Sequence, residues 1–569
     1  MKEYILKYNY LFLLYPFFIL SIAVTSNTGG SFSPERVVFF YLLLYFLAFF
    51  ISNKSLTALY VSFIYVCSLI FTFFEIGYVY LYKERITPST SFILLETNSS
   101  EVREYIAEYL DEKILLYLFL LIVPSYFILK GVNKLIRHFS FKEVLWAIGT
   151  DIKQLFKNKH VYSLTSWLTK IYNHRLKRAV LGLVILILAV TIYIKENHHK
   201  YHALFQLYNG YKEYLTEIKR YDNFSDSKWN NELLSSVKSR NEDDVKETYV
   251  LIIGESTTRN HLGIYDYYRN TTPKLNKIKE ELVIFNDVIS PHTHTIPSLE
   301  KVLTFGNREN PKRKYEGSII QLMKQAGFKT FWVSNQVPVG INETMVSMMA
   351  KASDYIHFTN LGGEKELRTL DERVLPYFEK VLQDKQHKKF IIVHLLGTHT
   401  QYKNRYPKQF NHFEDNPPTL FPSDKAHSII NEYDNAILYN DYIIGELIDL
   451  LKKHTTKLER TFALYFSDHG EDVFETVDFT GHSEVIGTKP MFQIPFVFWS
   501  NNKSERDKLK AYSDRKYMID DLIYSIADLT NITFSGFIPE KSIFNDSLEL
   551  RPRIVKNDID FDNHFLNNK

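Results

Sequence analysis

Three separate segments of this sequence carry side chains that could cooperate in one reaction. Glu255 and the pair Asp468 and His469 each follow an apolar run, and Thr295 lies between them in the chain. These groups offer three oxygen ligands and one nitrogen ligand, a set that suits zinc or manganese. A threonine hydroxyl is a poor nucleophile unless a metal or a base removes its proton. The pattern therefore predicts a metal site around a nucleophilic threonine; Thr293 is a rival, but Thr295 has the better spacing to the residues that follow it.

Several histidines near these segments could serve the same site. His399 and His482 lie in loops that follow predicted strands. They could bind a second metal, hold a phosphate, or act as general acid and base. A structural role is the alternative, and it is less expected for His399 than for His482. His292 and His294 flank the nucleophile and could equally be turn residues, so they receive no role.

The residues from position 247 onward have the pattern of an α/β domain that could bring these segments together. Short apolar strands alternate with amphipathic helices, which predicts a mostly parallel central sheet covered on both faces. In such sheets the ligand site lies beyond the carboxyl ends of the strands, where Glu255, His399 and Asp468 are expected. The predicted strands are residues 249–253, 283–288, 330–333, 390–394, 461–466 and 496–499, and the predicted helices are 272–280, 317–326, 370–382, 428–453 and 516–529.

The first third of the chain has the composition of a membrane domain. Each of its apolar runs is long enough, or nearly so, to cross a bilayer. The segment after the fourth run, residues 130–178, is rich in Lys and Arg, and the positive-inside rule predicts that it is cytoplasmic. An odd number of spans then puts the rest of the chain outside, which in a Gram-negative cell is the periplasm. The five predicted spans are residues 9–24, 37–51, 56–80, 114–129 and 179–194.

These patterns predict three parts of the chain. Residues 1–195 form a transmembrane domain with an external loop at about 82–112, residues 196–246 form a helical linker, and residues 247–569 form the catalytic domain. The net charge of +3 gives no broad positive field for nucleic acid, so no nucleic-acid partner is expected. Cys67 is the single cysteine, which excludes a disulfide within the chain and a cysteine-rich metal site.

Longer motifs around these residues resemble the alkaline phosphatase/sulfatase superfamily. Within it, the chain resembles the bacterial phosphoethanolamine transferases, five-span membrane enzymes with a periplasmic catalytic domain. The resemblance covers nearly the whole chain and is greatest to the CptA subgroup, which acts on the core heptose of lipopolysaccharide. The motifs that carry it are Ile253-Gly-Glu-Ser-Thr257, Tyr268-Arg-Asn-Thr-Thr-Pro273, Leu303-Thr-Phe305, Ile391-Ile-Val-His-Leu-Leu-Gly-Thr-His399, Tyr439-Asn-Asp441, Tyr465-Phe-Ser-Asp-His-Gly-Glu471 and the external Glu96-Thr-Asn98.

The resemblance implies a zinc enzyme that forms a covalent intermediate. A catalytic zinc would be held by Glu255, Thr295, Asp468 and His469, and a second zinc ion would be possible. Thr295 would become phosphorylated during the reaction. The implied donor is phosphatidylethanolamine, drawn from the lipid bilayer of the inner membrane, and the implied acceptor is lipopolysaccharide.

The resemblance also implies a set of residues that contact the substrate. His399 and His482 would contact the phosphoryl group or a second zinc. Thr97, Glu101 and Asn335 would lie near the phosphoethanolamine headgroup.

Departures from the family pattern bear on the acceptor. Relatives that act on lipid A carry periplasmic disulfides, which this chain cannot form, and the usual lysine near the substrate is not evident around Asn335. Both points favour the core heptose over lipid A, which stays an alternative together with phosphoglycerol transfer to a periplasmic glycan. A sulfatase is less expected because threonine cannot be oxidised to the sulfatase aldehyde and the arginine of that motif is missing. The complete ligand set argues against an inactive membrane scaffold.

Overall fold

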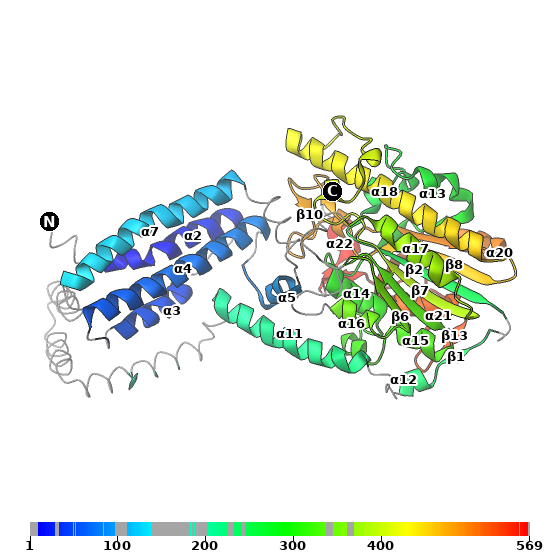
Figure 1. Ribbon diagram of the computed structural model, residues 1–569, viewed down its shortest axis with the longest axis horizontal. Coiled ribbons are helices and arrows are strands. Elements are labelled where there is room, and N and C mark those ends of the chain that lie inside the picture. The colour runs from blue at the N-terminus through cyan, green and yellow to red at the C-terminus, as the bar shows by residue number, and fades with distance from the viewer. Residues whose placement is uncertain are drawn as a thin grey trace. The chain divides into compact units, whose positions relative to one another are not determined.

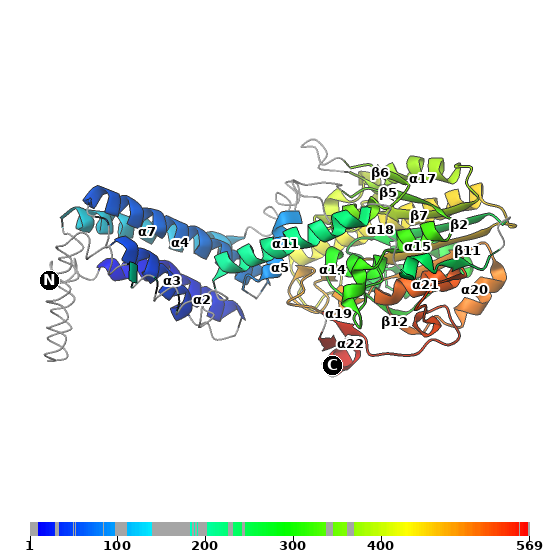
Figure 2. The same cartoon turned by 90° about the horizontal axis from the view of Figure 1, so that it is seen from below.

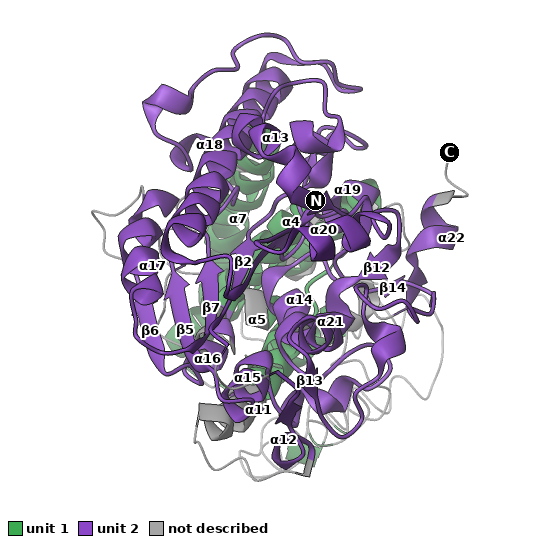
Figure 3. Cartoon of the chain, turned by 90° about the vertical axis from the view of Figure 1, so that its right-hand side faces the viewer, with its two compact units in different colours: residues 1–94, 109–214 green, residues 95–108, 215–569 purple. Residues whose placement is uncertain are grey.

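The protein is described here from a computed structural model, which forms two compact units. One unit comprises residues 1–94 and 109–214, and the other comprises residues 95–108 and 215–569 (Figure 3). The structure describes residues 9–28, 34–48, 51, 53–82, 85–96, 111–138, 183–184, 187, 191, 202–225, 232–241, 245–336, 345–360, 369–556 and 558–566.

The described part of the first unit is helical, as its apolar composition requires. Facing helices are joined by buried hydrogen bonds, such as the one from the Tyr65 hydroxyl to Ser125 Oγ at 2.9 Å. Polar contacts of this kind hold apolar helices together where surrounding apolar groups give no directional contacts. The helices are η1 (Asn9–Leu14), α2 (Tyr15–Thr28), α3 (Pro34–Leu47), α4 (Lys54–Tyr82), α5 (Pro88–Glu96), α7 (Glu112–His138) and α11 (Ala203–Ser225), the last of which continues into the second unit.

Two helices in the described residues are long and apolar enough to cross a membrane. They cover Lys54–Leu81 and Glu112–Arg137, and a shorter apolar helix covers Phe12–Asn27. The predicted spans 56–80 and 114–129 fall within the two long helices, and the predicted span 37–51 overlaps α3. The predicted span 179–194 lies outside the described residues except at positions 183, 184, 187 and 191. The number of five spans therefore stays a prediction.

The second unit is built on a seven-stranded sheet with the order β3-β11-β8-β2-β7-β5-β6. The strands β8, β2, β7, β5 and β6 are parallel neighbours, whereas β11 pairs antiparallel with both β8 and β3. The sheet is thus mixed, with one reversed strand in an otherwise parallel arrangement. The strands are β2 (Glu247–Gly254), β3 (Leu282–Ile284), β5 (Lys329–Ser334), β6 (Tyr355–Phe358), β7 (Lys388–His394), β8 (Arg460–Ser467) and β11 (Phe496–Ser500).

Helices cover both faces of this sheet, which explains why its central strands are continuous apolar runs. Val250 and Ile252 of β2 belong to the core shared with the face that carries α13 (Pro273–Lys277), α17 (Leu375–Leu382) and α18 (Asp424–His454) (Figure 1). Figure 2 views the opposite face, which is covered by α14 (Thr295–Leu303), α15 (Ile319–Gln325) and α21 (Leu522–Leu529). The α/β architecture predicted from the sequence is confirmed for this unit.

Some predicted elements differ from the structure in their bounds. The predicted strand 283–288 is two strands, β3 and β4 (Asp287–Ile289), and the first three residues of the predicted helix 516–529 form β12 (Lys516–Met518). β12 pairs in parallel with β4, which is distant in sequence. This strand pairing, and not the local helical preference of residues 516–518, determines their conformation. The remaining short α-helices and strands of the described residues are α12 (Glu232–Ser235), α16 (Met345–Ala350), α19 (Lys489–Phe492), α20 (Lys503–Lys510), α22 (Phe561–Leu566), β1 (Lys238–Ser239), β9 (Asp472–Val473), β10 (Thr480–Gly481), β13 (Ile532–Thr533), β14 (Ile554–Val555) and β15 (Ile559–Asp560).

Candidate active site

The parallel pairing of β2 and β8 brings the predicted metal ligands together at one edge of the sheet. Gly254 at the end of β2 is paired with Ser467 at the end of β8. Glu255 and Asp468 directly follow these two strands, so their side chains emerge side by side beyond the carboxyl ends. Asp468 Oδ1 accepts hydrogen bonds from the backbone N–H groups of Ser256 at 3.1 Å and His469 at 2.8 Å. The aspartate thereby fixes the turn that follows each strand.

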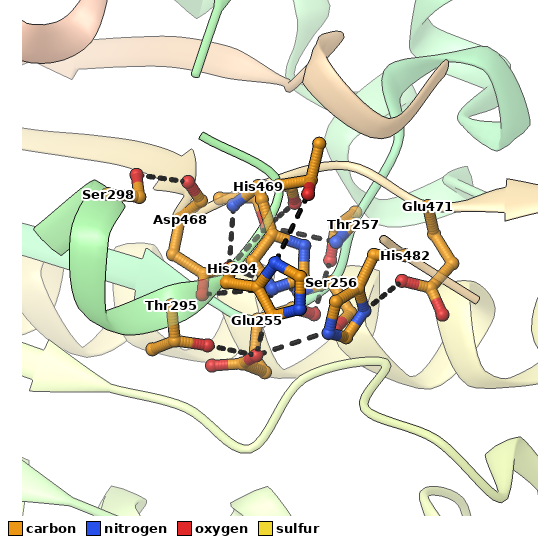
Figure 4. A network of polar contacts seen from close by, with 12 residues as sticks. Glu255, Ser256, Thr257, His294, Thr295, Ser298, Asp468, His469, Glu471 and His482 are labelled. Carbon is orange, nitrogen blue, oxygen red and sulfur yellow. Dashed lines mark hydrogen bonds and ion pairs between the residues drawn. The ribbon is translucent and has the colours of Figure 1, made fainter. Parts of the chain in front are cut away.

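Thr295 reaches this edge from the other direction, as the first residue of α14 (Figure 4). Its hydroxyl donates a hydrogen bond to Glu255 Oε1 at 2.9 Å. The segment around it is tied to the end of β8, because Ser298 Oγ donates to the Asp468 carbonyl at 2.6 Å. The structure thus brings Thr295 next to Glu255, which is 40 positions earlier in the sequence, and Asp468, which is 173 positions later.

A close approach of the loop after β7 completes this edge. Gly397 has a φ of +57°, a conformation in which most residues are strained. A Cβ atom at this position would lie 2.8 Å from the backbone N and O of Glu255. Glycine is therefore required for the loop that carries His399 to pack against the end of β2.

We call Glu255, Thr295, Asp468 and His469 the threonine cluster. One ligand atom each from Glu255, Asp468 and His469 lies within 4.8 Å of the others, and all three side chains are buried. His469 Nε2 lies 3.4 Å from both Glu255 Oε1 and Asp468 Oδ2. Within the described part of the chain, His469 Nε2 and Asp468 Oδ2 have no hydrogen-bond partner. Buried polar atoms without partners are costly, so this donor set fits a bound cation.

The electrostatics of the threonine cluster are consistent with that fit. Burial, followed by the nearby Glu255 carboxylate, raises the pKa of Asp468 to about 7. Burial lowers the pKa of His469, but Asp468 and Glu255 outweigh it and raise that pKa to about 10. Without a metal, the cluster therefore retains protons that offset its negative charge. A divalent cation would take over this role and displace them.

A second group, which we call the glutamate cluster, comprises His469, Glu471 and His482. Its ligand atoms also lie within 4.8 Å of one another. Here both carboxylate oxygens are occupied: Oε1 of Glu471 accepts from the Tyr402 hydroxyl at 2.8 Å, and Oε2 lies 2.9 Å from His482 Nδ1. Burial raises the pKa of Glu471 to about 8, and burial together with His469 and His399 lowers the pKa of His482 well below its usual value. The glutamate orients His482 toward the threonine cluster (Figure 4).

The other predicted site residues have different surroundings. Burial, followed by Arg405, lowers the pKa of His399 to about 4, and Asp468 and His469 are near enough to influence it. Asn335 is fully buried, with its amide donating to Asp371 Oδ1 at 2.9 Å and accepting from Thr359 Oγ1 at 2.7 Å. Thr97 and Glu101 lie outside the described residues.

Three residues of the site were not given a role from the sequence. Gln336, next to Asn335, donates through Nε2 to Glu255 Oε2 at 3.2 Å and to the Leu395 carbonyl at 3.0 Å. Glu471 belongs to a motif noted in the sequence, and its spacing of three residues from Asp468 was the available signal. Tyr402 had no such signal, because a tyrosine in a loop is common and only packing brings it to Glu471.

Comparison with known proteins agrees with this geometry. Residues 247–532 match the sulfatase family. The chain is 31% identical over 505 residues to phosphoethanolamine transferase EptC of Escherichia coli K12, covering 84% of this chain and 81% of EptC. It is also 31% identical over 508 residues to phosphoethanolamine transferase CptA of Salmonella typhimurium LT2, covering 85% and 82%. The crystal structure of the periplasmic domain of Escherichia coli EptC in complex with Zn superposes with a TM-score of 0.54 at 35% identity, covering 57% of this chain and 95% of that domain.

Fold and site together define a sulfatase-type catalytic domain. Within that class, the chain belongs to the phosphoethanolamine transferase family and is a transferase of the EptC and CptA type.

Proposed function

We propose that this enzyme transfers phosphoethanolamine from phosphatidylethanolamine to the core heptose of lipopolysaccharide, with Thr295 as the covalent carrier. One observation carries the proposal: the Thr295 hydroxyl donates to Glu255 at 2.9 Å, beside two buried ligand atoms that have no hydrogen-bond partner in the described residues. A hydroxyl in that position is next to the place where a cation would bind. The names of the relatives support phosphoethanolamine as the transferred group.

The expected cation is zinc, held by Glu255, Thr295, Asp468 and His469. The mixed oxygen and nitrogen donors suit this metal, and the EptC periplasmic domain was crystallised with Zn. Bound there, zinc would lower the pKa of the threonine hydroxyl and offset negative charge on the phosphoryl oxygens. One ion is expected in the threonine cluster, and a second ion would be held by His399 and His482.

In the first step, Thr295 Oγ attacks the phosphorus of phosphatidylethanolamine. A bond forms between Oγ and phosphorus, the bond from phosphorus to the diacylglycerol oxygen breaks, and that oxygen leaves with a proton as the alcohol. Glu255, which accepts the Thr295 hydrogen bond, holds Oγ in place for the attack. The helix that begins at Thr295 also directs its first backbone N–H groups toward the incoming anionic group.

In the second step, a hydroxyl of the acceptor sugar attacks the phosphorus of phosphoethanolamine-threonine. The new bond to the sugar oxygen forms, the Oγ–phosphorus bond breaks, and Thr295 recovers its proton. We assign His399 and His482 to the proton transfers and to contacts with the phosphoryl group. His482 suits this role because Glu471 at 2.9 Å fixes the orientation of its ring.

We further propose that residues 1–195 span the inner membrane five times and that the catalytic domain lies in the periplasm. Two described helices that are long and apolar enough to cross a bilayer support a membrane location. A membrane domain would present a lipid donor to the site, which a soluble phosphatase would not need. Thr97, Glu101 and Asn335 are proposed to lie near the phosphoethanolamine headgroup.

Mass spectrometry of lipopolysaccharide from cells with and without this protein tests the proposal. The expected result is a gain of one phosphoethanolamine group on the core fragment, which is lost when the Thr295→Ala variant replaces the wild type. A gain on the lipid A fragment would instead assign the enzyme to lipid A. A phosphoglycerol gain on a periplasmic glycan, or no gain on either fragment, would overturn the proposed reaction.

A further inference from the structure

A chain of three polar side chains lies behind the nucleophile and takes no part in the mechanism above. His292 Nδ1 lies 2.5 Å from Glu484 Oε1, and His292 Nε2 lies 2.8 Å from Lys301 Nζ. His292 is 6% exposed and Lys301 is 8% exposed. Lysine is rarely buried to this extent unless its ammonium group is paired, so the arrangement requires a reason.

The donor and acceptor roles in these two contacts determine the tautomer of His292. A lysine ammonium can only donate hydrogen bonds, so His292 Nε2 must be the acceptor. His292 Nδ1 therefore carries the proton and donates it to Glu484. The chain runs in one direction, from Lys301 through a single tautomer of His292 to Glu484, and it cannot form with either end replaced by an apolar residue.

These three residues come from segments that carry the proposed catalytic groups. Lys301 is on α14, the helix that begins with Thr295, and Glu484 is two residues after His482. His292 lies three residues before Thr295, and its carbonyl oxygen is 2.6 Å from Ser290 Oγ. The chain thus joins the loop that carries His482 to the helix and the turn that carry Thr295.

A second contact shows how closely the joined segments meet. The rings of His294 and His482 lie with their centroids 5.0 Å apart in an edge-to-face arrangement. An aromatic contact of this kind contributes only about 0.5–1.5 kcal/mol, so by itself it holds the two segments weakly. A directional chain of hydrogen bonds whose His292 and Lys301 members are buried restricts shifts between the segments more strongly.

We propose that Glu484, His292 and Lys301 are positioning residues that hold the His482 loop against the helix carrying Thr295. The proposal rests on the proposed roles of Thr295 and His482. None of the three needs to touch the phosphoryl group. Their effect is expected on the chemical step, because a displacement of about 1 Å between reacting groups can reduce the rate by roughly 100-fold.

Substitutions at His292 separate positioning from simple loss of structure. His292→Leu removes both contacts, whereas His292→Gln offers an amide N–H to Glu484 and an amide oxygen to Lys301, which preserves the direction of the chain. Lys301→Met breaks the chain from its other end. Lys314→Met is the matched control, because it removes the 2.9 Å ion pair between Lys314, which lies in the 3-10 helix Pro311–Tyr315, and Glu300 of α14.

The experiment measures phosphoethanolamine transfer by the purified full-length enzyme in lipid nanodiscs, together with its zinc content and melting temperature. For His292→Leu and Lys301→Met we expect kcat to fall roughly 10- to 100-fold with KM for the lipid donor and the zinc content unchanged. For His292→Gln and Lys314→Met we expect kcat within about threefold of the wild type, since the conservative amide restores the contacts and the control pair lies outside the chain.

The outcomes distinguish this proposal from the proposed function. Full kcat in both His292→Leu and Lys301→Met would overturn the positioning role while leaving the transferase assignment intact. Equal losses in His292→Leu and His292→Gln, accompanied by lost zinc and a lower melting temperature, would also overturn it, because they indicate a general structural role. Absence of transfer by the wild-type enzyme would overturn the proposed function and this role with it.

Discussion

The threonine cluster and the glutamate cluster share His469 but differ in how their carboxylates are satisfied. In the glutamate cluster, both oxygens of Glu471 have partners, the Tyr402 hydroxyl at 2.8 Å and His482 Nδ1 at 2.9 Å. In the threonine cluster, Asp468 Oδ2 and His469 Nε2 are buried without a hydrogen-bond partner among the described residues. The two groups have similar spacing between their ligand atoms, so spacing alone does not identify a metal site.

This difference in hydrogen bonding indicates which cluster requires a bound cation. Leaving a buried polar group unpaired costs about 1–3 kcal/mol, and more when the group is charged. In the threonine cluster that cost is offset in part by the 3.4 Å ion contacts of His469 Nε2 with Glu255 and Asp468, and a bound cation would offset the rest, whereas both oxygens of Glu471 already have hydrogen-bond partners. We therefore expect zinc first in the threonine cluster, and we expect Glu471 to act by orienting His482.

The largest effect is expected from removing the nucleophile. Thr295→Ala should reduce transfer by at least about a thousand-fold, because the Thr295 hydroxyl donates to Glu255 Oε1 at 2.9 Å whereas the Ser256 hydroxyl lies farther away at 3.4 Å. Zinc should still bind when it is supplied in excess, since Glu255, Asp468 and His469 are still present, but with lower affinity because one of the four proposed ligands is lost. Transfer is measured on lipid substrates, and zinc by elemental analysis of the same samples. Thr295→Ala with wild-type activity would remove threonine from the mechanism.

A pair of glutamate substitutions compares the two clusters directly. Glu255→Ala should weaken zinc binding by at least about 100-fold because it removes a ligand, and Glu471→Gln should weaken it by less than about tenfold. Competition with a zinc-binding dye gives both affinities. If Glu471→Gln lost as much zinc as Glu255→Ala, the glutamate cluster would be a metal site and the contrast between the clusters would fail.

Removing the metal tests whether the threonine cluster is the site at which zinc stabilises the folded enzyme. Zinc at about 100 times its dissociation constant should stabilise the folded enzyme by about 2.7 kcal/mol, which raises the melting temperature relative to chelator-treated protein. The increase should disappear in Asp468→Asn, which lacks one charge of the threonine cluster, and persist in Glu471→Gln. Thermal unfolding of all three proteins with and without zinc provides the measurement, and an unchanged increase in Asp468→Asn would contradict the assignment.

The smallest effect is expected at Tyr402. Tyr402→Phe removes the hydroxyl that donates to Glu471 at 2.8 Å and should cost about 1 kcal/mol of stability. Activity should fall only a few-fold, because His482 keeps its own contact with Glu471, and zinc content should not change. Kinetics and zinc analysis together check this; a loss of zinc in Tyr402→Phe would connect the glutamate cluster to the metal.

Much of the catalytic unit could be predicted from the sequence because its central strands are continuous apolar runs. Glu255, Asp468 and His469 follow such runs, and parallel strands bring their carboxyl ends to one edge. The reversal of β11 could not be predicted, since strand direction depends on how the chain crosses the sheet. β6 was missed because its four residues are only partly buried and lack an apolar run.

The site residues that were missed reach the cluster through tertiary packing. Gln336 follows β5, two strands away from β2, and tertiary packing brings its amide to Glu255 and to the Leu395 carbonyl just after β7. The chain from Lys301 to Glu484 was equally invisible, because its members lie 9 and 192 residues from His292 in sequence. No local pattern encodes contacts of this kind.

The most direct test of the central claim is to isolate the covalent intermediate. The full-length zinc-loaded enzyme is mixed with phosphatidylethanolamine in the absence of acceptor, quenched in acid and digested for peptide mass spectrometry. The account predicts a gain of one phosphoethanolamine group on Thr295, and no gain in Thr295→Ala. An unmodified Thr295 peptide under conditions that release diacylglycerol, or modification of Thr293 instead, would contradict it.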